Sequence, residues 1–256
     1  GGRQDLAVAL FVADDLKDRG DIRASLAVFS AIENAASLAG DLRAKAAALV
    51  GKARAQLRSN AAAAAARSAE AARKMYADLG DAAGEIGCVV AIAHAQDVLG
   101  DPAAARSVLE ECRAKMRPES LFDKLPVLGS EVLARLAWAT AQISAKNRDA
   151  AAFSISVGAL FDEAEELAAR AHHTHRLIDA KSKRLQAMLR FRENPTNLFA
   201  QVLTLCREND NAYFMGFTLL QQAQHQLLLL AEQNGGLTVG DSKEADPLKK
   251  GSKGDR

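Results

Sequence analysis

The chain of 256 residues is long enough to bury a substantial core, and its charges nearly cancel to a formal net charge of +1. This balance argues against a general binder of nucleic acid or of anionic membranes, which usually carries an excess of Lys and Arg. No apolar run approaches the roughly 20 residues that a helix needs to cross a bilayer, so we expect no direct membrane span.

The cysteine content favours a reducing compartment. Cys88, Cys112 and Cys206 are odd in number, lie far apart and form no Cys-x-x-Cys pair, so we expect buried or half-buried thiols instead of a disulfide framework. The cytoplasm or an organelle interior would fit. No signal or transit peptide is visible, although the chain begins with Gly1-Gly2 and not with Met, which leaves processing or truncation open.

The most informative feature is a Gly-Asp step that recurs every 20 residues. Gly ends a helix because it accepts a positive φ, and Asp begins the next helix by accepting the free amide hydrogens of its first turn. Asn60 falls on the same spacing and also tolerates a left-handed turn. The spacing therefore predicts helix, tight turn and helix in repetition, at Gly20-Asp21, Gly40-Asp41, Gly80-Asp81 and Gly100-Asp101.

In chain order, apolar stripes of helical period and these turns predict the following helices: 4–19, 22–38, 42–58, 61–78, 82–99 and one that starts at Pro102. After a connector between Pro118 and Pro126, we expect a long helix over about 127–145. Residues 150–193 contain two helices or one long bent helix. Helices over 196–207 and about 211–233 follow, and the polar remainder predicts a flexible tail.

The small residues repeat with a period of 40. Ala13, Ala53 and Ala93 fall in one column when the first three 40-residue units are superposed, and Gly20, Asn60 and Gly100 fall in another. A fixed period of this kind is the signature of a repeat architecture. We expect residues 1–120 to form three helical hairpins, 121–233 further hairpins with a C-terminal capping helix, and 234–256 the tail.

The best-formed stretch runs from Leu79-Gly80-Asp81 through a helix to Leu99-Gly100-Asp101. It resembles the tetratricopeptide repeat in its longer, roughly 40-residue form, as found in kinesin light chains and in the sensor regions of some bacterial regulators. Gln96 departs from that pattern, which usually has Tyr there. The resemblance covers residues 1 to about 118 well and 121–170 weakly, and it rests on these matching positions: Ala93, Gly100, Ala105, Leu109 and Cys112.

This resemblance implies an all-α fold, a right-handed superhelix of antiparallel helical hairpins. The family binds other proteins or peptides on a concave face that the first helix of each hairpin forms. By analogy with it, Asp14, Arg54 and His94, which share one position of the 40-residue period, would face this groove and contact a partner. The plainer interpretation, which we favour, is an exposed helix face or a half-buried, hydrogen-bonded His.

Three histidines form one polar cluster that could attract a metal ion. If helical, His172, His175 and Asp179 would share one face and could hold zinc with a water. We favour the alternative, a solvated helix end, because no Cys or second motif supports a metal. No metal or cofactor is therefore expected.

Two other segments have competing interpretations. The basic run from Arg176 to Arg192 has only Phe191 as an aromatic neighbour, which favours a solvated helix over a nucleic-acid surface. The leucines at 227–230 point all round a helix, so they either pack against preceding helices, which we favour, or bind a partner.

The sequence contains no nucleophile motif, phosphate loop or dinucleotide fingerprint, so we do not expect an enzyme. We expect a non-catalytic protein–protein interaction scaffold or adaptor that binds a peptide or helix on its concave face. The alternative is a structural subunit of a large multi-subunit complex. A third class, an enzyme that uses the histidine cluster, has little support.

Overall fold

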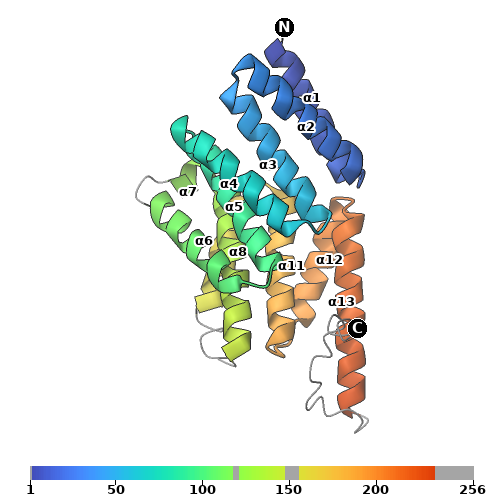
Figure 1. Ribbon diagram of the computed structural model, residues 1–256. Coiled ribbons are helices and arrows are strands. Elements are labelled where there is room, and N and C mark those ends of the chain that lie inside the picture. The colour runs from blue at the N-terminus through green and yellow to red at the C-terminus, as the bar shows by residue number, and fades with distance from the viewer. Residues whose placement is uncertain (1, 118–120, 148–155, 234–256) are drawn as a thin grey trace, which may run out of the picture.

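The computed structural model describes residues 2–117, 121–147 and 156–233, and this part of the chain is entirely helical (Figure 1). The tail predicted over 234–256 lies outside the described residues. The helices of the first half are α1 (Gly2–Asp18), α2 (Ile22–Ala39), α3 (Leu42–Arg58), α4 (Ala62–Asp78), α5 (Ala82–Val98) and α6 (Pro102–Met116). Those of the second half are α7 (Leu121–Lys124), α8 (Pro126–Asn147), α10 (Gly158–Arg170), α11 (Thr174–Arg190), α12 (Thr196–Glu208) and α13 (Ala212–Gln233).

The predicted turns have the expected backbone geometry. Gly20, Gly40, Gly80 and Gly100 all have positive φ, and Asn60 takes the same left-handed conformation at φ 60°. The aspartates that follow the glycines each accept a hydrogen bond of 2.9–3.1 Å from the backbone N–H three residues later. The Gly-Asp step therefore ends one helix and begins the next, as predicted.

The turns of the second half use other residues in the same conformation. His172, Arg192 and Asp210 have φ values of 51°, 55° and 49°. His172 lies in the turn between α10 and α11. The described part of the segment 150–193 therefore contains two helices and not one long bent helix. These residues are spaced 20 and then 18 positions apart, and none is glycine, which is why the Gly-Asp pattern does not reveal the turns.

Helices pack mainly on their neighbours along the chain, as successive pairs from the blue α1–α2 to the orange α12–α13 in Figure 1. They form two layers. The first layer, whose members also contact one another directly, comprises α1, α3, α5, α8, α11 and α13; the second layer comprises α2, α4, α6, α10 and α12.

Small residues allow this close packing. Ala13, Ala53 and Ala93 are all buried. In the second-layer helices, Ala65 and Ala105 are buried at the position that Ser25 occupies in α2. The Ser25 hydroxyl donates a 2.8 Å hydrogen bond to the backbone carbonyl of Ala13, so the polar member of this set is satisfied.

Helix α5 lies at the centre of the fold. Its middle, residues 86–93, is apolar and buried on all sides, and the helix packs against α3, α4, α6 and α8. The apolar core that begins on α5 and α6 continues through α8 and α10 to α11. Trp138 of α8 links three helices of this core, a contact that we call the Trp138 junction. Its indole N–H donates a 3.0 Å hydrogen bond to Asp97 of α5, and the Arg190 guanidinium of α11 lies 4.9 Å from its ring centroid.

The end of the last helix departs from the expected internal packing. Helix α13 contacts α11 and α12, but the leucines at 227–230 are between 43% and 65% exposed. The sequence interpretation that favoured their burial is wrong, because the neighbouring helices α11 and α12 are shorter than α13 and do not cover its C-terminal part.

Candidate functional site

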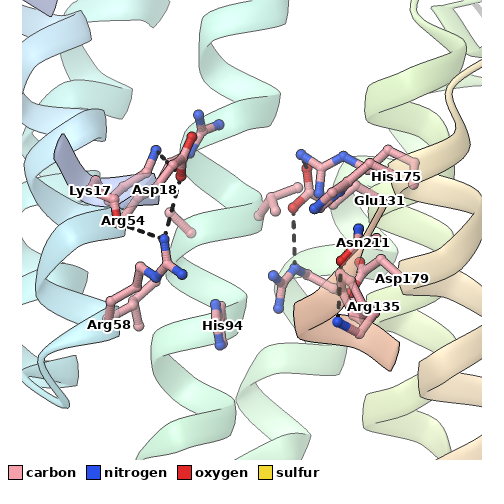
Figure 2. A pocket seen from close by; sticks show the side chains of 15 residues that line it. Lys17, Asp18, Arg54, Arg58, His94, Glu131, Arg135, His175, Asp179 and Asn211 are labelled. Atoms are coloured by element: carbon pink, nitrogen blue, oxygen red, sulfur yellow. Dashed lines mark hydrogen bonds and ion pairs between the residues drawn. The ribbon is translucent and has the colours of Figure 1, made fainter. Parts of the chain in front are cut away.

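The first layer encloses a pocket of about 1000 Å³. The residues that line it belong to α1, α3, α5, α8, α11 and α13, apart from Asn211, which directly precedes α13, and none belongs to the second layer. Figure 2 shows the charged side chains on two facing walls, with His94 between them. The pocket therefore brings together segments that lie nearly 200 residues apart in the sequence, from Lys17 to Phe214.

The first wall comes from α1 and α3. Lys17 pairs with Asp14 at 2.6 Å, and the Arg58 guanidinium donates a 2.7 Å hydrogen bond to the backbone carbonyl of Lys17 and lies 3.4 Å from Asp18. Arg54 lies on the same wall. Its Nη2 is close to α5, since a Cβ added to Gly87 would lie 3.8 Å from that atom. Arg54 has no hydrogen bond or ion pair with any described residue, so its guanidinium is available to a ligand.

The second wall comes from α8 and α11. Arg176 pairs with Glu131 at 2.7 Å, and Nε of Arg135 lies 3.7 Å from the same carboxylate. That Nε is buried and has no hydrogen-bond partner within the described residues. Next to it, Asp179 pairs with Lys183 one turn along α11.

Burial and charge together set the ionisation of this wall. Burial acts to raise the pKa of Asp179, but the positive charges of Lys183 and Arg135 outweigh it and lower that pKa to about 2. Burial lowers the pKa of Lys183, and Asp179 counteracts this effect. The pair is therefore an ion pair within the wall, and its charges largely cancel.

His94 lies between the two walls, on α5. Burial, reinforced by repulsion from Arg135 and Lys183, lowers its pKa to about 3. The imidazole is therefore neutral near pH 7. A neutral imidazole has one donor and one acceptor nitrogen, so it adds a polar contact without adding charge.

Two of the three residues that the repeat period selects line this pocket. Arg54 and His94 both do, and Asp14 contacts the pocket through its ion pair with Lys17. Their contact with a partner stays a prediction. The sequence interpretation missed Glu131, Arg135 and Asn211, because the 40-residue period breaks after residue 116 and no longer identifies the equivalent positions.

The histidine cluster is not arranged as one helical face. His172 has a left-handed backbone at the turn, and His173 caps α11 by accepting a 3.3 Å hydrogen bond from the N–H of Arg176. Only His175 is in α11, where its ring meets the Phe214 ring edge-on at 5.5 Å. Within the described ranges, no three His, Cys, Asp or Glu side chains are placed to hold a metal ion.

The basic run on α11 is not a solvated face. Arg176 pairs with Glu131, Lys181 with Glu165 at 2.7 Å, and Arg184 with Asp162 at 2.6 Å. These cations therefore hold α11 against α8 and α10, and the expectation of a solvated helix is wrong.

The three cysteines are free and buried. Burial raises the pKa of Cys88 to about 12 and that of Cys112 to about 11, which keeps both thiols protonated. In the part of the chain that the structure describes, no helix is long and apolar enough to cross a membrane.

Fold and pocket together define an all-helical protein whose helices pack in sequence around a charged internal groove. No protein-family model matches the chain, and a search of the curated proteins finds no match to it.

Proposed function

We propose that the protein is a non-catalytic interaction scaffold or adaptor, a right-handed superhelix similar to tetratricopeptide repeats, and that its pocket receives a peptide or helix of another protein. The observation that carries this proposal is the origin of the pocket lining. Apart from Asn211, which directly precedes α13, the lining comes from the first layer of helices. In the proposed repeat this layer would hold the first helix of each hairpin.

The chemistry of the pocket supports binding. Its apolar lining consists of Leu57, Val90, Ala91 and Phe214, and charged side chains surround this strip. A concave site with an apolar strip and a few convergent polar groups suits recognition of a chain segment. His94, the imidazole at its centre, has its pKa lowered to about 3, far from the pH at which a general base works best.

Site-specific photo-crosslinking tests this proposal. A photoreactive amino acid at Leu57 in the pocket, introduced in the cells that make the protein, should crosslink a discrete partner. The same amino acid at Arg67, which is exposed on the second-layer helix α4, is the control. Crosslinks from position 67 alone would contradict binding in the pocket.

The alternative is a structural subunit of a stable multi-subunit complex. The exposed apolar side chains favour it: Phe11 on α1 is 75% exposed, and the leucines at 227–230 are exposed on α13. An adaptor stays soluble and monodisperse when purified alone, whereas an assembly subunit often aggregates without its partners. Sedimentation of the purified chain distinguishes the two.

A further inference from the structure

The pocket has more positive than negative charge. Five basic and three acidic side chains line it. The basic side chains are Lys17, Arg54, Arg58, Arg135 and Arg176; the acidic ones are Asp18, Glu131 and Asp179. His94 adds no charge near pH 7. The lining is therefore complementary to a ligand with negative charge.

Most of these cations already have partners. Lys17 and Arg58 are engaged on the first wall, and Arg176 pairs with Glu131 on the second. Two guanidinium groups are less engaged: that of Arg54, which has no hydrogen bond or ion pair with a described residue, and that of Arg135, whose Nε lies 3.7 Å from Glu131 without a hydrogen bond.

Arg54 and Arg135 come from opposite walls, α3 and α8, with His94 between the walls (Figure 2). Guanidinium matches the planar carboxylate geometry. We propose that the segment bound in the pocket is acidic, with Asp or Glu side chains paired to Arg54 on one wall and Arg135 on the other, and an apolar side chain against the half-buried Leu57 and Phe214. This inference rests on the proposed function and specifies its partner.

The same lining argues against other anions. A nucleic-acid strand would meet the carboxylates of Asp18, Glu131 and Asp179, and Phe214 is the only phenyl ring among the lining residues on which a base could stack. A small anion would occupy one wall and leave the other guanidinium unpaired.

Selection from a phage-displayed library of random peptides against the full chain tests the proposal. The selected peptides should be enriched in Asp and Glu. Binding of a selected peptide, followed by fluorescence anisotropy, should weaken about tenfold in Arg54→Gln, because hydrogen bonds to charged groups contribute more than neutral ones. Arg135→Gln should weaken it similarly, with melting followed to confirm that the variant is folded. Replacing the acidic residues of the peptide by Asn or Gln should have the same effect.

Arg67→Gln is the matched control, because Arg67 is an exposed arginine outside the pocket, and it should leave the affinity unchanged. Selection of neutral or basic peptides whose affinity Arg54→Gln does not alter would overturn the acidic partner but leave the proposed groove intact. If succinate or phosphate at millimolar concentration displaces the bound peptide, the pocket is a site for a small anion and the proposal is overturned. Failure to select any peptide would contradict the proposed function itself, and the acidic partner with it.

Discussion

The ring of Phe29 lies directly against the Cα of Gly51. Phe29 is fully buried on α2, and a Cβ built on Gly51 of α3 would overlap the Cε1 and Cζ atoms of that ring. The contact joins the first two hairpins, and it depends on the absence of a side chain at position 51.

Gly51→Ala should therefore destabilise the protein by about 1–3 kcal/mol through overpacking. Chemical denaturation of both proteins measures the difference. Gly216→Ala is the control, because Gly216 is an exposed residue in the middle of α13 with open space around it. Alanine there should stabilise the protein by up to about 1 kcal/mol. Equal effects at the two sites would contradict the close contact.

A second test concerns the buried alanines between helices. Ala105 is 1% exposed on α6, so Ala105→Leu should cost about 1–3 kcal/mol of unfolding free energy. Ala103→Leu places the same side chain two residues away on the exposed side of the helix and should cost little. If both variants melt like the wild type, the helices are not in close contact at Ala105.

The turn conformation is testable at Gly100. Its φ of +83° disfavours a β-branched residue, so Gly100→Val should lower the free energy of unfolding by about 1 kcal/mol or more. Thermal melting measures this loss, and unchanged stability would be inconsistent with a left-handed turn.

The reverse substitution should have the opposite effect in the second half. Arg192 is exposed and has a φ of 55°. Arg192→Gly should relieve the strain of a left-handed L-residue and stabilise the protein by about 0.5–1 kcal/mol. A loss of stability would mean that the side chain of Arg192 contributes more than the backbone strain costs.

The stability should depend on pH through His94. Its pKa in the folded chain is about 3, below the ordinary 6.5, so the unfolded chain binds more protons between these two pH values. The stabilisation from neutral His94 is therefore complete above about pH 6.5 and is lost as the pH falls, by at most about 1.4 kcal/mol per pH unit. His94→Gln should remove this part of the pH dependence, as measured by denaturation from pH 7 to pH 4.

The sequence predicts the first half of the fold closely, because glycine and aspartate mark the helix boundaries there, with Asn60 in place of glycine between α3 and α4. The boundary at His172 could not be predicted in the same way, since a left-handed histidine has no distinctive sequence pattern. The next left-handed residue, Arg192, does follow it by 20 positions.

The candidate site is predictable only on one wall. Arg54 and His94 belong to the 40-residue period and can be found from it. Arg135 and Glu131 belong to α8, which follows the break in that period, and their position opposite Arg54 depends on how far the chain curves. Such curvature is a sum of small rotations between packed helices, which the sequence pattern does not record.

The junction at Trp138 has a consequence for how the pocket accommodates a partner. The walls belong to different arms of the molecule, α1 and α3 on one side and α8, α11 and α13 on the other, and α5 connects them. Trp138 holds α8 to α5 through Asp97 and contacts Arg190 of α11. It therefore fixes the angle between the two arms. The distance between the two walls is therefore set by a contact that lies outside the pocket lining, so a substitution at Trp138 would alter the width of the pocket without changing any residue that lines it.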